Sequence, residues 1–296
     1  MPLDTLLNDQ LGQQLVLNLR LPRLITSALL GMSLAAAGGV MQMLFRNPLV
    51  EPGFLGVTQG AGFGAALSIL FLSVSPLVIE LSAAGFAVIG LLLSYFIARR
   101  IRFGGWVLRL VLSGIAVSAL FSAGLGILKY MADPTSQLPE IVFWLLGGLW
   151  SVTWSDLFFI LPAVVIGLII IFLMRWRLNL LAVNDETAFS LGVAVGRERV
   201  LLLGASVLVT AAVVSVAGIV GWIGLIIPHI ARRIAGANAD AFIPVSMSLG
   251  AVFGMICDDI ARVLTTGEIP LGIITSLLGA GIFLVMMTAR SIRIAR

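Results

Sequence analysis

The residue types that build most catalytic and metal centres are almost absent from this chain of 296 residues. It has one cysteine, Cys257, and one histidine, His229. One residue of each kind cannot assemble a zinc, haem or iron–sulfur site within one chain, and a single cysteine cannot form a disulfide within it. We therefore expect no metal site and no cofactor in this chain.

A phosphate-binding loop is missing as well. The only lysine, Lys129, is followed by Tyr130, so the chain has no G-x-x-x-x-G-K-[ST] motif with which to bind and hydrolyse ATP. His229 stands among apolar and basic neighbours rather than beside a nucleophile that it could activate. The sequence therefore predicts a protein that is not an enzyme, and any ATP must be hydrolysed by another subunit.

Charge is scarce and apolar residues dominate. Charged residues make up 11% of the chain and hydrophobic residues 60%, and the mean hydropathy is +1.13. Several apolar stretches reach the roughly 20 residues that a helix needs to cross a bilayer. Lipid offers no hydrogen-bond partners to the backbone, so these spans must be helical. The sequence predicts an all-α, polytopic transmembrane helical bundle that forms one domain over residues 1–296.

Nine segments are candidates for membrane spans. Two of them are unusual: 54–74 is glycine-rich at its start, and 218–231 is short and carries Pro228, so we expect it to be tilted, broken or re-entrant. The nine segments are about 24–45, 54–74, 76–98, 106–130, 156–174, 200–217, 218–231, 242–261 and 271–289.

The basic residues predict the orientation of these spans. If the spans alternate sides, fourteen arginines share one side and only Arg20, Arg23, Lys129 and Arg262 take the other, which makes the first side cytoplasmic. The net charge of +4 then reflects topology, and we expect no nucleic-acid partner. The same alternation puts residues 1–19 outside without a signal peptide, so we expect one further helix upstream of them.

Small residues and intramembrane acids are the next informative features. Among 32 glycines, Gly60/Gly64 and Gly250/Gly254 have the GxxxG spacing that lets helix backbones approach closely. Asp258 and Asp259 lie within a predicted span, where carboxylates mark ion or proton pathways. A proton-coupled secondary transporter that uses these two residues is therefore the alternative hypothesis, although Arg262 is close enough in sequence to pair with one of them.

A polar island at residues 175–199 separates two apolar runs on the predicted cytoplasmic side. Within it, NDETAFSLG predicts a short helix capped by Asn184 or Asp185, with Glu186 in its first turn and Gly192 as its stop. A solvated loop has no need of apolar side chains such as Leu180, Leu181, Phe189 and Leu191. Such side chains on a cytoplasmic element predict a docking surface that fills a groove in a partner.

Four stretches in order along the chain resemble the FecCD family. They are RLPRLITSALLGMSLAAAGGVMQMLFRNPLVEPGFLGVTQGAGFG (20–64), LNLLAVNDETAFSLGV (178–193), AGIVGWIGLIIPHIARRIAG (217–236) and GEIPLGIITSLLGAGIF (267–283). The resemblance implies the multi-pass permease subunit of an ATP-binding-cassette (ABC) importer in the cell's inner (cytoplasmic) membrane. It also implies a homodimer with the translocation path at its axis. Family members have one more helix ahead of the RLPR motif, and that helix is absent from this chain.

The resemblance also implies partners and residue roles. Two copies of an ABC ATPase subunit, which hold ATP and Mg²⁺, would dock on the cytoplasmic segment, and a periplasmic or lipoprotein substrate-binding protein would dock outside. The substrate class that it implies is an iron complex, either siderophore or haem, or cobalamin, and some branches of the family handle oxyanions instead. The residues that match the ATPase-coupling segment are Asn179, Leu180, Leu181, Asp185, Glu186, Phe189, Leu191 and Gly192, and those that match the binding-protein contacts are Arg20, Arg23 and Arg262.

Overall fold

The computed structural model describes residues 10–72, 74–183, 185–265 and 267–288, and within these ranges it contains helices and no strand. This confirms the all-α prediction. Among the described residues, seven helices are long and apolar enough to cross a membrane. They are Gly12–Leu44, α5 (Pro76–Arg100), α6 (Trp106–Met131), α8 (Trp154–Leu181), α10 (Val195–Ala217), α12 (Ala239–Val263) and α13 (Leu271–Thr288).

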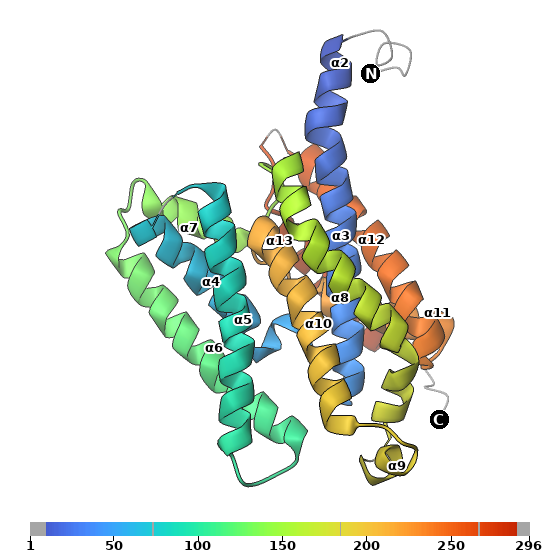
Figure 1. Cartoon of the computed structure of the whole chain (residues 1–296). Coiled ribbons are helices and arrows are strands. Elements are labelled where there is room, and N and C mark those ends of the chain that lie inside the picture. The colour runs from blue at the N-terminus through green and yellow to red at the C-terminus, as the bar shows by residue number, and fades with distance from the viewer. Residues whose placement is uncertain (1–9, 73, 184, 266, 289–296) are drawn as a thin grey trace.

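The first of these helices is composite. It joins α2 (Gln10–Leu15), a π-helical turn η1 (Val16–Arg20) and α3 (Leu21–Leu44) without a break, so it begins well before the predicted start at residue 24. Figure 1 shows α2 rising beyond the other helices at one end of the bundle. The Trp154 indole donates a hydrogen bond of 2.9 Å to the carbonyl of Leu17, which ties this extension to the start of α8.

The two unusual predicted spans form shorter helices. The predicted span 54–74 covers the second half of η2 (Pro52–Leu55) and the whole of α4 (Val57–Leu67) and η3 (Ser68–Leu72). Within 218–231 the helix α11 begins only at Ile223, and it continues past Pro228 and His229 to Ala235. Two other short helices, α7 (Gln137–Leu146) and α9 (Asp185–Ser190), flank α8 in the chain.

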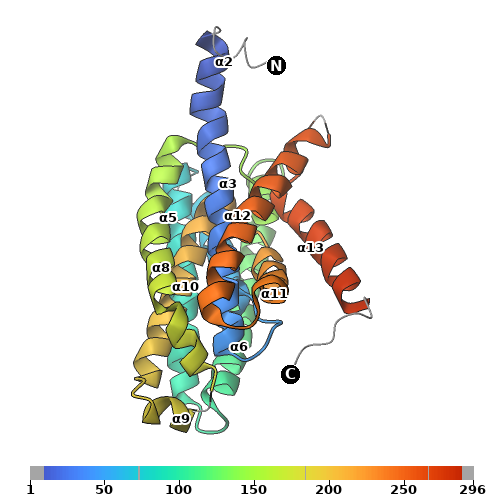
Figure 2. The same ribbon diagram turned by 90° about the vertical axis from the view of Figure 1, so that its right-hand side faces the viewer.

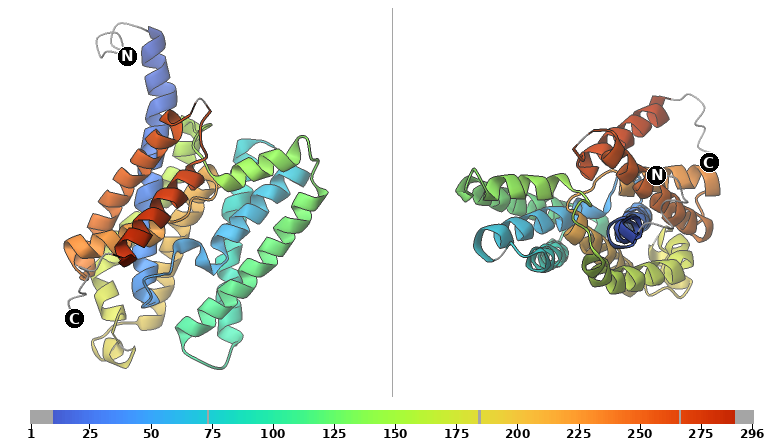
Figure 3. Two further views of the ribbon diagram at one scale, coloured as in Figure 1. Left: turned by 180° about the vertical axis from the view of Figure 1, so that it is seen from behind. Right: turned by 90° about the horizontal axis from the view of Figure 1, so that it is seen from above.

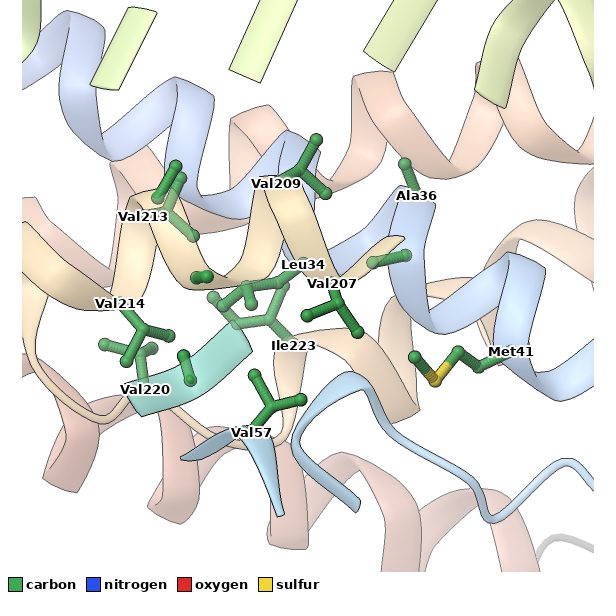
Figure 4. Close-up of a cluster of buried hydrophobic side chains, with 14 of the residues drawn as sticks. Leu34, Ala36, Met41, Val57, Val207, Val209, Val213, Val214, Val220 and Ile223 are labelled. Atoms are coloured by element: carbon green, nitrogen blue, oxygen red, sulfur yellow. The ribbon is translucent and has the colours of Figure 1, made fainter. Parts of the chain in front are cut away.

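Helix α3 is the centre of the bundle. Seen along the bundle in Figure 3, it stands between α8, α10, α11 and α12, and it contacts all four. Its run of small residues from Ala35 to Gly39 is buried. The core continues into α10 and the start of α11, where Val209, Val213 and Ile223 pack in the cluster shown in Figure 4. Helix α13, by contrast, stands away from the other helices along most of its length in Figure 2.

Both predicted GxxxG pairs lie at close helix crossings. A Cβ atom on Gly250 would lie 2.3 Å from the Gly31 carbonyl oxygen, and one on Gly254 would lie 2.4 Å from that of Ser27, so α12 and α3 meet backbone to backbone. Gly60 and Gly64 do the same for α4 against α5. Lipid supplies no hydrophobic drive between helices, and close van der Waals packing of this kind holds them together.

Basic residues gather at one end of the bundle. Arg46 follows α3, Arg99 and Arg100 end α5, and Arg232 lies near the end of α11. The ends of α3 and α5 lie at the lower end of Figure 1, together with α9. We call this the inner end, because the positive-inside rule predicts that it faces the cytoplasm.

Candidate functional site

The polar island folds as predicted into a short helix at the inner end. Helix α9 begins at Asp185, while Asn184, the other candidate cap, lies outside the described residues. Gly192 adopts φ +80°, and its N–H donates to the Phe189 carbonyl while Val193 N–H donates to that of Ala188. This pair of bonds is a Schellman motif, in which glycine takes the left-handed conformation that ends a helix. Ala188 and Val193 are both buried, so one side of α9 is fixed to the protein.

Two arginines hold the start of α9. Arg199 of α10 donates to both carboxylate oxygens of Asp185, at 2.8 and 2.5 Å. This hydrogen bonding holds the pKa of Asp185 below its ordinary value of 3.8. Arg46, which follows α3, donates to the Val183 carbonyl and lies 3.9 Å from Asp185. The helix is therefore joined both to α10 and to the central helix.

Asn179 joins the same segment to α12. Its side-chain amide donates to the Asn238 side chain at 2.8 Å, and its carbonyl oxygen accepts from Ala239 N–H at 2.9 Å. Asn238 is itself the N-cap of α12 and accepts from Asp240 N–H. Asn179 thus fixes the beginning of α12 rather than pointing toward a partner.

The apolar residues of the segment divide into two groups. Leu181 is 1% exposed and Leu180 packs against the same core, so the prediction that they fill a partner's groove is wrong for Leu181 and unsupported for Leu180. Both belong to α8, whose last turn is buried by its neighbours. Phe189 is 76% exposed and Leu191 is 59% exposed, and Glu186 is exposed beside them. The most exposed apolar side chains of the segment therefore lie on the free face of α9 and at the residue after it.

At the outer end, Arg23 is buried in an ion-pair network. Its Nε and Nη2 donate to Asp258 at 3.0 and 2.8 Å, and its Nη1 donates to both oxygens of Glu268 at 2.9 Å. Arg23 is only 9% exposed, so the prediction that it contacts a binding protein is corrected: the guanidinium is used within the chain, between α3 and the end of α12. Local sequence patterns cannot reveal this pairing, because the two partners lie 235 and 245 positions away from Arg23.

The other external arginines remain accessible. Arg20 is exposed on the turn η1. Arg262 donates to Asp259 and lies 3.8 Å from Asp258, in agreement with the expected local pairing. The side chain of Arg262 keeps 29% of its surface exposed. A docking role for Arg20 and Arg262 stays a prediction.

An open depression of about 870 Å³ lies between α7, α11, α13 and the α3–α4 connection. Its lining is largely apolar and includes Phe54, Leu145, Trp222 and Leu277. Glu51 also reaches it and accepts a hydrogen bond from the Trp222 backbone. Trp222 has φ +71°, a conformation that costs a bulky residue free energy and is retained at functional sites. Sequence reasoning missed Trp222, because only the folded backbone reveals this conformation.

The described residues contain no group of three or more His, Cys, Asp or Glu side chains that could hold a metal ion. Several charged side chains in the described ranges form pairs that join helices, as with Arg177 and Glu198 at 2.9 Å. The accessible features are the exposed face of α9, the outer arginines and the depression.

Comparisons with known proteins agree with this arrangement. A sequence model of the FecCD transport family matches residues 2–289. The molybdate import system permease protein MolB of Haemophilus influenzae is 38% identical over 94% of this chain and 82% of its own length. The hemin transport system permease protein HmuU of Yersinia pestis is 40% identical over 90% of this chain and 81% of its own length.

Solved structures give the same result. One described as an inward-facing metal-chelate type ABC transporter is 38% identical and has a TM-score of 0.90, over 94% of this chain and 89% of that one. The PsaBC protein of Streptococcus pneumoniae has a TM-score of 0.61 at 17% identity, which indicates a shared fold only. With its multi-pass helical architecture, the chain belongs to the FecCD transport family of membrane permeases.

Proposed function

We propose that this chain is the permease subunit of a binding-protein-dependent ABC importer and that a separate ATPase subunit docks on α9. The observation that supports this most directly is the exposure of Phe189, 76%, on a helix whose opposite side is buried and whose ends are fixed. An exposed phenylalanine on a cytoplasmic helix is stabilised by a groove in a partner, the helix-in-groove mode of recognition. Two ATPase copies, each with ATP and Mg²⁺, would serve a dimer of this chain.

The depression supports a role as part of the translocation path. Its volume, about 870 Å³, is in the range of pockets that hold small organic ligands. It is open on one side, and we propose that a second copy of the chain closes it to complete the path. Arg20 and Arg262 at the outer end would contact acidic residues of a periplasmic or lipoprotein-anchored binding protein and set its register by charge complementarity.

The bonds around α9 support a route for coupling. Asp185 is bound by Arg199 of α10, and Asn179 is bound to the start of α12. Both helices pack on α3, which forms the centre of the bundle. A shift of α9 on ATP binding would therefore act on α10, α12 and α3. It would switch the permease between two arrangements of its helices only if the ATPase binds these two arrangements with different affinity.

For the substrate we propose an iron complex, either siderophore or haem, or cobalamin. The relatives include an iron chelatin permease of Helicobacter pylori and a cobalamin permease of Halobacterium salinarum, as well as the hemin and molybdate permeases. The largely apolar lining of the depression suits a bulky organic complex better than a small hydrated oxyanion.

A reconstitution experiment tests this proposal. The chain would be placed in liposomes with its ATPase and binding protein, and ATP hydrolysis and uptake would be measured with ferric siderophore, haem, cobalamin and molybdate in turn. We expect the loaded binding protein to stimulate hydrolysis and one organic complex to be taken up. Stimulation by molybdate alone would contradict the proposed substrate, and uptake driven by a proton gradient without ATP would contradict the importer.

The proton-coupled alternative has little support in the geometry of the acids. Asp258 is bound by Arg23 and flanked by Arg262, and Asp259 is bound by Arg262. Neither carboxylate lines the depression. Both acids are therefore used in ion pairs away from the proposed path.

A further inference from the structure

A second cavity lies at the inner end of the bundle, among α5, α6 and α10. It measures about 210 Å³ and is separate from the depression. Three arginines line it, Arg99 at the end of α5, Arg109 in the first turn of α6 and Arg199 in α10. Tyr95 and Trp106 stand among them.

The arginines carry positive charge that the described residues do not balance. Arg199 is paired with Asp185, but the hydrogen bond described for the Arg109 guanidinium is one of 3.3 Å to the Ile101 carbonyl. No carboxylate within the described ranges lies within 4.0 Å of Arg99 or Arg109. The cavity therefore holds at least two guanidinium groups that lack a counter-charge there.

Buried hydrogen-bond donors point to the same conclusion. The Nε atoms of Arg109 and Arg199 are buried and have no acceptor among the described residues. Arg199 itself is only 7% exposed. A buried charged donor without a partner is costly, so such groups are normally satisfied by a ligand or water. Here the donors line a cavity that has room for an acceptor.

The aromatic rings and a glycine shape this space. The Cζ atom of Arg199 lies 4.5 Å from the centre of the Trp106 ring, and that of Arg99 lies 5.9 Å from the centre of the Tyr95 ring. Such cation–π contacts orient planar guanidinium groups. Gly196 also lines the cavity, and a Cβ atom added there would meet no heavy atom within 4 Å. The space beside α10 is therefore open rather than filled by side chains.

We propose that this cavity binds the phosphate group of an anionic glycerophospholipid in the cytoplasmic leaflet. Guanidinium groups bind phosphate oxygens through paired, charge-assisted hydrogen bonds, and basic pockets between membrane helices at the cytoplasmic side suit anionic headgroups. Phe96, Leu108 and Leu201, next to the lining on the same three helices, are exposed apolar side chains along which acyl chains would lie. A soluble phosphate has the same chemistry but makes no use of this apolar surface.

Native mass spectrometry of the delipidated full chain tests the proposal, with phosphatidylglycerol compared with phosphatidylcholine of identical acyl chains. We expect one phosphatidylglycerol to bind about tenfold more tightly, a difference of about 1.4 kcal/mol. Arg99→Gln and Arg109→Gln should each remove most of this preference. Arg102→Gln is the matched control, because this substitution removes the same charge. Arg102 is exposed in the connection between α5 and α6 and does not line the cavity.

Two further measurements complete the test. One distinguishes a loss of binding from a loss of folding, and the other distinguishes a lipid ligand from soluble phosphate. Gly196→Leu fills the cavity without a change in charge, and it should abolish the preference while the lipid-free melting temperature stays unchanged. Inorganic phosphate should not displace the lipid. If phosphate displaces the lipid completely, and if Arg109→Gln abolishes the binding of phosphate, then a soluble phosphate is the ligand and the lipid assignment is overturned. If the two lipids bind equally, or if Arg102→Gln reduces the preference for phosphatidylglycerol as much as Arg99→Gln and Arg109→Gln do, the proposed site is wrong.

Discussion

Arg199 of α10 donates hydrogen bonds of 2.8 and 2.5 Å to the two carboxylate oxygens of Asp185 of α9, which lies fourteen positions earlier in the sequence. The pair joins the exposed helix at the inner end to a helix that packs directly on the centre of the bundle. The pairing survives only while Asp185 is ionised.

The first prediction follows from this pairing. The pKa of Asp185 is lowered in the folded protein, so the pair contributes stability above the unfolded value near 3.8 and loses it as the pH falls through the lower folded pKa. We expect Asp185→Asn to lower the melting temperature in detergent at pH 6, and the difference from the unmodified protein to shrink progressively as the pH falls below about 4.

The effect should be small, because the Asp185 side chain is 55% exposed and solvent screens the pair. Glu186→Gln is the matched control, since Glu186 is its exposed neighbour and has no ion pair within the described ranges. A melting difference for Asp185→Asn that persists unchanged to pH 3 would contradict the account.

The second prediction concerns the buried pair of Arg23 and Asp258. Removal of Arg23 leaves the buried Asp258 carboxylate with only Arg262, at 3.8 Å, and breaking a buried pair costs about 3–5 kcal/mol, so Arg23→Met should lower the melting temperature strongly. The double variant Arg23→Met/Asp258→Asn should recover part of the loss. The control Arg20→Met changes an exposed arginine nearby and should have little effect. Equal effects of the two single arginine variants, measured by thermal unfolding in detergent, would show that Arg23 is not buried in this network.

The third prediction concerns the crossing of α3 and α12. Gly250→Ala places a methyl group 2.3 Å from the Gly31 carbonyl oxygen, so the helices must separate, at a cost of roughly 1–3 kcal/mol. Gly281→Ala in α13 is the control, because nothing lies within 4 Å of its added methyl group, and alanine favours a helix by up to about 1 kcal/mol. Thermal unfolding of both variants compares the two effects, and a Gly250→Ala protein as stable as Gly281→Ala would exclude the close crossing.

Much of the fold could be predicted from local patterns. Long apolar runs such as 106–130 match helices to within a few residues, because a bilayer permits little else in such a run. The Gly250/Gly254 spacing predicted a close crossing, and Gly192 predicted the end of α9, since both depend on backbone geometry that few residues other than glycine allow.

Contacts distant in sequence could not be predicted in the same way. The position of Arg23 just before a predicted span predicts an exposed side chain. The helix begins earlier than predicted, and Arg23 lies within it, in the interior beside Asp258. Leu181 was assigned to a surface by its place in a polar segment, although α8 continues into that segment and buries it. Both errors arose where a helix extends beyond its apolar run.

We propose that the exposed apolar face formed by Phe189 of α9 and the adjacent Leu191 binds the ATPase subunit. Phe189→Ala and Leu191→Ala should leave folding unchanged, because both side chains are exposed, and should reduce binding of the ATPase by about tenfold when combined. Phe103→Ala is the matched control, since Phe103 is 64% exposed in the α5–α6 connection and lies outside α9.

The most direct measurement is the affinity of the purified ATPase subunit for the chain in detergent, for the unmodified protein, the Phe189→Ala/Leu191→Ala variant and the Phe103→Ala control. The account predicts that only the α9 variant loses affinity, at an unchanged melting temperature. Retained affinity in the α9 variant, or an equal loss with Phe103→Ala, would contradict it.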